Sequence, residues 1–201
     1  SSGLASRTDL KYDTVEAIDL RATSASFAAG SGDEAYSTTV NMSAIPADSD
    51  GTLIAAGGVS EPVALPTTAT AGGAAVDLFD FTLSDGGGGD GYTLDLAQVT
   101  LNTSGTGPFS QVTFRLKGPD ASDVVGTYSS GDNTLTFDVS ISVADGGSET
   151  YVVDAFYADA TGLTENQTLV LSVDGDDLTT SGTQMSGSNG RVDNGTGSVV
   201  G

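Results

Sequence analysis

The sequence predicts an all-β fold: an antiparallel β-sandwich of Ig-like or jelly-roll-like type, with an extended N-terminal arm or small β unit. Three observations predict this fold. Several segments after residue 75 alternate apolar and polar residues, as half-buried strands do. Clusters of Gly, Asp and Asn, which favour turns, separate these segments every 8–15 residues. The chain is rich in Thr and Val, which favour strands, and no segment has a convincing helical period.

Each alternating segment places its apolar residues on one face, so these residues are expected to form the core. The predicted strands cover residues 79–83, 94–101, 112–116, 135–143, 151–157 and 169–173. The apolar phase changes between Leu96 and Val99, which predicts a β-bulge there. Residues 124–128 are expected to form a short edge strand. Asp80 and Asp138 lie on the polar phase of their strands and are expected to face water.

The sequence divides into two regions of different regularity. Residues 1–62 alternate only loosely, which indicates an extended arm or a small β-rich region. Residues 63–201 are assigned to the sandwich domain, and Pro62 and Pro66 bracket a linker at its start. The tail from residue 186 is rich in Gly, Ser and Asn, so it is either a flexible end or a final exposed strand.

The absent residue types exclude several chemistries. The chain has no Cys and no His, which rules out disulfides, the usual zinc sites, Cys nucleophiles and His-based triads. Paired carboxylates could hydrolyse glycosides without either residue. Because 27 acidic residues create such pairs by chance, we expect no enzyme activity.

The net charge of −21 comes from 27 acidic and only 6 basic residues. Nucleic acid and anionic membrane surfaces are therefore unsuitable partners, and no apolar run is long enough to insert into a membrane. Asp outnumbers Glu by 22 to 5, which fits turn-rich β structure, although adaptation to high salt would also account for an acidic chain. An extracellular or cell-surface location is expected.

The Asp-rich turns are candidate calcium sites, because Ca²⁺ prefers carboxylate and carbonyl oxygens in loops. None of them completes a known calcium motif, and the alternative is that Asp only forms turns and a solvated face. The candidate ligands are Asp48, Asp50, Asp85, Asp90, Asp174 and Asp176.

Two further features of the surface are candidates for function. Sequons for N-glycosylation begin at Asn41, Asn102, Asn166 and Asn194. Four tyrosines after residue 90 could form a carbohydrate-binding platform, although the alternation places Tyr151 and Tyr157 in the core row of their strand.

Several short stretches between residues 79 and 190 resemble a module that is repeated in very large bacterial surface and secreted proteins. These stretches read DFTLSDG at 80–86, NTSGTG at 102–107, FRLKGPD at 114–120, SVADG at 142–146 and LSVDG at 171–175. The resemblance implies an Ig-like sandwich that serves as a spacer or adhesin segment, and it carries over no catalytic residues.

Two functions follow from these features. The first is a non-enzymatic extracellular structural subunit that self-assembles, such as a pilin-like or matrix-filament protein, with itself or other cell-surface components as partners. Residues 13–27 or 198–200 could complete a neighbour's sheet by donor-strand complementation. The alternative is a calcium-dependent adhesin or a carbohydrate-binding sandwich.

Overall fold

The computed structural model describes residues 49–87, 89–187 and 189–201, which belong to one compact unit, Ala47–Gly201. This unit is a sandwich of two sheets, and the only helical elements among its described residues are three 3₁₀ turns of three residues each. The predicted all-β class and sandwich architecture are confirmed. The structure does not describe residues 1–48, so most of the expected N-terminal arm, including residues 13–27, lies outside the described residues.

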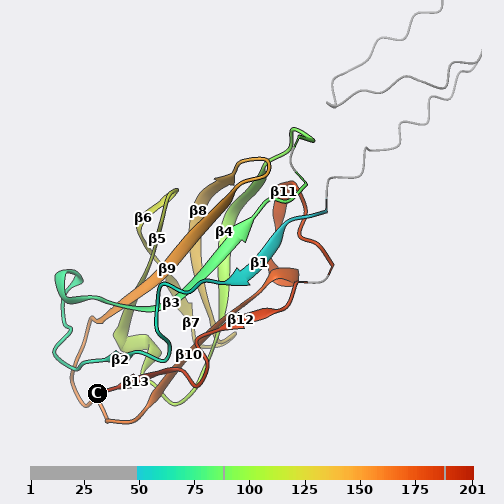
Figure 1. The fold of residues 1–201 in the computed structure, drawn as a ribbon. Coiled ribbons are helices and arrows are strands. Elements are labelled where there is room, and N and C mark those ends of the chain that lie inside the picture. Colours follow the sequence, from blue (N-terminus) through green and yellow to red (C-terminus); the bar gives the residue numbers. More distant parts are fainter. Residues whose placement is uncertain (1–48, 88, 188) are drawn as a thin grey trace, which may run out of the picture. The chain divides into compact units, whose positions relative to one another are not determined.

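The first sheet has five antiparallel strands and the second has eight (Figure 1). The five-stranded sheet has the order β1 (Thr52–Ala55), β3 (Val76–Ser84), β9 (Ser148–Tyr157), β5 (Val112–Gly118) and β6 (Ala121–Val125). The eight-stranded sheet has the order β2 (Ala64–Leu65), β13 (Ser198–Val200), β10 (Thr168–Asp174), β4 (Leu94–Ser104), β8 (Thr134–Val143) and β7 (Thr127–Ser129). In addition, β11 (Thr180–Gly182) pairs with β4, and β12 (Arg191–Asp193) pairs with β10.

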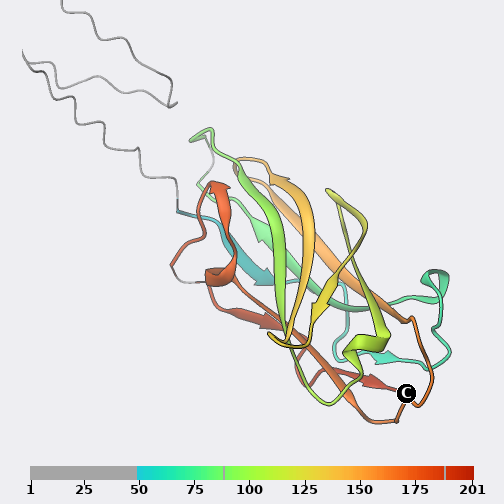
Figure 2. The same cartoon turned by 180° about the vertical axis from the view of Figure 1, so that it is seen from behind.

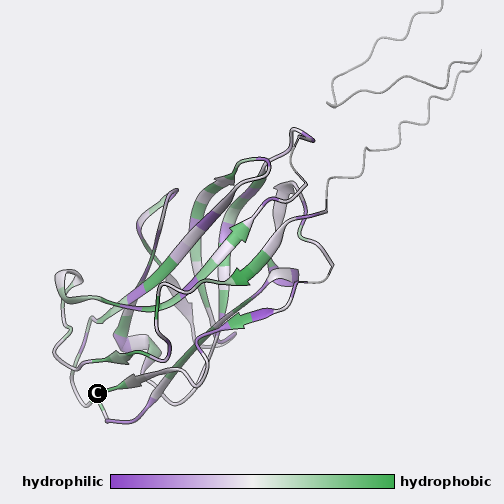
Figure 3. Cartoon of the chain, viewed as in Figure 1, coloured by the Kyte–Doolittle hydropathy of each residue, from purple (hydrophilic) through white to green (hydrophobic). Residues whose placement is uncertain are grey.

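The predicted alternation accounts for the core between the sheets. Every second residue of β5 from Val112 to Leu116 is buried, as are Leu135, Phe137 and Ile141 on β8. Hydrophobic and hydrophilic residues accordingly succeed one another along the long strands (Figure 3). On β4 the pairing register with β8 shifts between Leu96 and Gln98, which confirms the predicted irregularity.

At one flank of the sandwich the chain crosses from one sheet to the other. A single residue, Gly126, joins β6 of the five-stranded sheet to β7 of the eight-stranded sheet (Figure 2). Its N–H donates to the Phe114 carbonyl over 2.9 Å. A Cβ at this position would lie 2.7 Å from atoms of both Leu135 and Phe137, so the close approach requires glycine. The single edge strand expected over residues 124–128 is therefore two strands, one in each sheet.

Asn189 closes the opposite flank at the outer edge of β1. The Leu53 N–H donates to Asn189 Oδ1 over 2.8 Å, and Asn189 Nδ2 donates to the Gly51 carbonyl over 3.0 Å. The side-chain amide thus occupies the hydrogen-bonding positions that a further strand would take, which protects the sheet edge.

The sandwich begins earlier in the chain than the expected boundary between residues 62 and 63. Residues 52–55 form β1 and pair with β3, and Leu53 is buried in the core. The strand was not predicted, because the small residues at positions 55–58 interrupt the alternation of apolar and polar residues. The stretch between Pro62 and Pro66, expected to be a linker, contains β2, and Leu65 is fully buried.

The C-terminal tail is neither a flexible end nor an exposed strand in the described structure. β12 and β13 both pair with β10, and β13 also pairs in parallel with β2. Val200 and Ser198 are fully buried. Residues 198–200, one candidate for a donated strand, therefore complete the chain's own sandwich.

Candidate functional site

The Gly-rich loop between β3 and β4 gathers several carboxylates at one end of the sandwich. Asp145 accepts hydrogen bonds from the backbone N–H groups of Gly89 and Gly91, at 2.8–2.9 Å. Asp90 accepts the N–H of Tyr92 over 2.9 Å. These bonds fold the loop and leave each carboxylate beside backbone amides, as expected for turn-forming Asp.

Asp50 and Asp85 lie at the base of the same loop. Asp85 is buried and its Oδ2 accepts the Thr183 hydroxyl over 2.9 Å. A Cβ at Gly86 would lie 3.1 Å from Asp50 Cγ, which places the Asp50 carboxylate directly against the loop backbone. The Oδ1 atom of Asp50 is buried and has no hydrogen-bond partner among the described residues.

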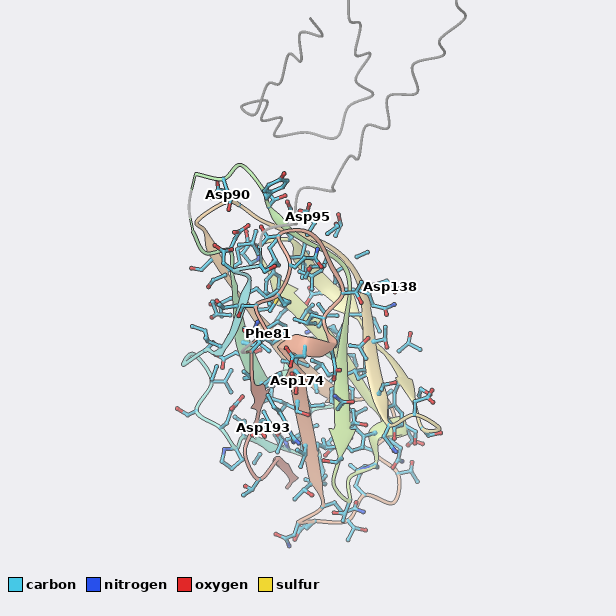
Figure 4. The ribbon with its side chains drawn as sticks, turned by 90° about the vertical axis from the view of Figure 1, so that its right-hand side faces the viewer. Phe81, Asp90, Asp95, Asp138, Asp174 and Asp193 are labelled. Atoms are coloured by element: carbon cyan, nitrogen blue, oxygen red, sulfur yellow. The ribbon has the colours of Figure 1, made fainter. Side chains whose placement is uncertain are left out.

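The structure divides the six candidate calcium ligands between different places. Asp50, Asp85 and Asp90 lie around the loop, whereas Asp174 is well separated from Asp90 along the sandwich (Figure 4). Asp174 Oδ1 accepts the N–H of Asp176 and caps a 3₁₀ turn. Asp48 lies outside the described residues. Within residues 49–201, as far as they are described, no three acidic side chains form a group that could hold a metal ion.

The described sequons differ sharply in exposure. Asn102 and Asn166 are exposed and remain candidates for glycosylation. Asn194 is fully buried, so a glycan at this position is incompatible with the fold. Its Oδ1 accepts the Leu171 N–H, and its Nδ2 donates to the Leu169 carbonyl, both over 3.0 Å. Asn41 lies outside the described residues.

The tyrosines do not form a carbohydrate platform. Tyr151 and Tyr157 are fully buried, as their place in the core row predicted. Tyr128 is half-buried and stacks on Phe109 with a distance of 5.4 Å between ring centroids. Tyr92, like Tyr128, is half-buried, so none of the four tyrosines offers a fully exposed ring for stacking against a sugar.

A cluster of charged residues on the five-stranded sheet was not predicted. Arg115 on β5 makes two hydrogen bonds to Asp154 on β9, whose side chain is only 2% exposed. Lys117 Nζ lies 2.7 Å from Asp77 Oδ1 and 3.2 Å from Asp154 Oδ2. Burial lowers the pKa of Lys117, but the hydrogen bonds to Asp77 and Asp154 outweigh it and raise that pKa overall. The amine therefore stays protonated, which suits an ion pair and not a nucleophile.

A second unpredicted site is the carboxylate of Asp80 on β3. The alternation placed this residue toward water, but its exposure is 2%. The N–H groups of Gly58 and Val59 both donate to its Oδ2, so the segment between β1 and β2 covers it. Local alternation could not reveal this burial, because the covering segment is about twenty residues away in the sequence.

Comparison of the sequence with protein-family models finds no matching family, and comparison with curated proteins finds no matching relative. Separately, the described residues contain no helix that is long and apolar enough to cross a membrane.

Proposed function

We propose that the chain is a non-enzymatic structural subunit of an extracellular surface layer or filament, which associates with further copies of itself. The observation that carries this proposal is which groups the carboxylates bind. Seven described aspartates accept hydrogen bonds from the chain's own backbone, and no three described acidic side chains form a group that could hold a metal ion. Those with a backbone donor are Asp80, Asp90, Asp120, Asp145, Asp159, Asp174 and Asp193.

The two flanks of the five-stranded sheet support self-association through β6. Among the described residues, the large hydrophobic side chains that are exposed are Ile54 on β1 and Val125 on β6, at 54% and 60% exposure. Asn189 closes the edge of β1, whereas β5 is the only described strand that pairs with β6. Asp123 has a φ of 54°, which limits the regular edge to Val124 and Val125. Stable assembly would need further contacts, and a donated strand from residues 13–27 of a neighbour would supply them.

Negative-stain images of the full-length protein test this proposal. We expect filaments from the wild type and from Ile54→Lys, the matched control on the closed edge. Val125→Lys places a charge on the open edge and is expected to leave single particles. Deleting residues 1–30 is also expected to leave monomers. Filaments from the deletion variant would eliminate the donated arm, and filaments from Val125→Lys would eliminate the β6 edge.

A calcium-dependent adhesin is the second candidate, favoured by the position of Asp50. Its buried Oδ1 lacks a hydrogen-bond partner among the described residues and lies at the loop that also holds Asp85 and Asp90. A ligand that binds only the native state raises Tm. Millimolar calcium should therefore raise the Tm of the wild type and of Asp174→Asn, but not of Asp50→Asn. An unchanged wild-type Tm would remove this candidate, and glycan-array binding lost in EDTA would favour it.

A further inference from the structure

The segment that connects β1 to β2 is attached to β3 through one buried carboxylate. Asp80 Oδ2 accepts the N–H of Gly58 over 2.7 Å and the N–H of Val59 over 2.9 Å. The other oxygen, Oδ1, is buried and has no hydrogen-bond partner among the described residues. A buried acceptor without a donor lowers the stability of the fold. This cost applies in full to Asp80, because only 2% of the residue is exposed.

Glu61, on the same connecting segment, brings a second carboxyl group to this place. Its Oε1 accepts the backbone N–H of Asp80 over 3.3 Å. Burial raises the pKa of Glu61 from 4.5 to about 7; the Asp80 N–H opposes this, and the charges of Asp80 and Asp193 add to it. Asp193 on β12 is paired with Arg191, at 3.2 Å between Nε and Oδ2. β1 and the rest of residues 56–65 carry no other ionisable side chain.

We propose that a protonated Glu61 donates its O–H to the Asp80 carboxylate, and that this proton, shared in the hydrogen bond, holds residues 56–62 closed over β3. The neutral Glu61 carboxyl group supplies the O–H donor that the buried Asp80 oxygen lacks. Loss of the proton leaves two adjacent negative charges, one of them fully desolvated, so the connecting segment loosens. A proton fits this place better than a metal ion, because the described residues offer no group of three metal-ligating side chains here. The inference does not depend on the proposed function.

The direction of the pH dependence follows from proton linkage. Between pH 4.5 and about 7 the native state holds a proton on Glu61 that the unfolded chain releases. The free energy of unfolding therefore falls as pH rises through this window and is constant, for this group, above it. Most ion-paired carboxylates have the opposite effect, because with them the free energy of unfolding decreases as pH falls. The sign of the pH dependence therefore identifies the Glu61 contribution.

Glu61→Gln in the full-length chain is the decisive variant, because its amide imitates the protonated carboxyl group at every pH. We expect its Tm to match the wild type at pH 5.5 and to exceed it at pH 8.5 by about 2–4 °C. Glu165→Gln, at an exposed position, removes the same charge from the same acidic chain and serves as the control. Equal Tm differences for the two variants at pH 8.5 would overturn the proposal.

Two further measurements distinguish a shared proton from a general charge effect and from a bound cation. Hydrogen exchange of residues 56–62, referenced to the unfolded chain at each pH, should lose protection between pH 5.5 and 8.5 in the wild type and keep it in Glu61→Gln. Unchanged protection in the wild type would contradict the proposal. If millimolar calcium at pH 8.5 raises the Tm of the wild type but not of Glu61→Gln, the pair holds a cation and the proton assignment is wrong.

Discussion

Arg115 and Asp154 face each other on neighbouring strands and form a two-point ion pair, with 2.9 Å between Nε and Oδ1 and 2.5 Å between Nη2 and Oδ2. The register places Arg115 directly opposite Asp154 in the β5–β9 ladder. The guanidinium also lies over the Phe156 ring, 5.6 Å from its centroid, and donates to the Gly72 carbonyl. One buried carboxylate thus fixes the conformation of the arginine that ties β5, β9 and the 3₁₀ turn at Gly72–Ala74 (η1) together.

Asp154→Asn is expected to lower the free energy of unfolding by about 2–3 kcal/mol, because Arg115 and Lys117 both lose their buried counter-charge. The side chain of Arg115 is 18% exposed, so the loss should stay below that of a fully buried pair. Asp77→Asn is the matched control, since Asp77 is 51% exposed and should cost less than about 1 kcal/mol. Urea unfolding measures both, and equal losses would show that burial of Asp154 contributes nothing.

Asn194→Asp is expected to destabilise the sandwich by about 2 kcal/mol or more. The substitution removes the N–H groups that donate to the Leu169 carbonyl and the Ser198 hydroxyl, and buries a charge without a counter-ion. Because this amide holds the tail onto β10, protection from hydrogen exchange should be lost first at β12 and β13. Asn102→Asp, at an exposed position on β4, is the control and should have little effect. Full protection of β13 in Asn194→Asp would contradict this assignment.

The strands could be predicted from the sequence, but the burial of particular polar residues could not. Alternation along β8 and β9 is a local property that a common core imposes, so residues such as Leu135 and Tyr151 reveal their own environment. Asp80 and Asp154 lie on the polar phase of their strands and are nevertheless buried. Their burial depends on partners distant in the sequence, namely Gly58 and Arg115, and no local period carries that information.

The short strands β12 and β13 could not be predicted from the sequence for a related reason. β12 and β13 have three residues each, too few to show a period. Asn194, between them, replaces part of the ladder with its side chain by bonding Leu169 and Leu171 of β10. The Gly-, Ser- and Asn-rich composition of the tail therefore left a flexible end and an exposed strand as the alternatives, although Asn194 marks the point where the chain attaches to the sheet.

Gly126→Ala is expected to destabilise the protein by about 1–3 kcal/mol through overpacking where the chain changes sheets. The added methyl group would lie 2.7 Å from Leu135 Cδ1 and Phe137 Cε1, so the core must shift to admit it. Gly131→Ala is the control, because no atom lies within 4 Å of a Cβ there and its φ is not positive. That variant should change stability by less than about 1 kcal/mol. Urea unfolding of the pair decides the matter, and equal stabilities would show that Gly126 is replaceable.

The charge of the chain makes self-association depend on salt. Subunits with a net charge of −21 repel one another, and only Arg115, Lys117 and Arg191 are basic within residues 49–201. Raising the ionic strength from about 0.01 M to about 1 M shortens the screening length from about 30 Å to about 3 Å. We therefore expect the fraction of assembled protein in sedimentation velocity to rise steeply with NaCl. Magnesium at the same ionic strength should act like NaCl if screening is the cause. Assembly that is complete at about 0.01 M salt would mean that repulsion between subunits does not limit association. Assembly that responds to calcium alone would instead favour a calcium site at the loop beside Asp50.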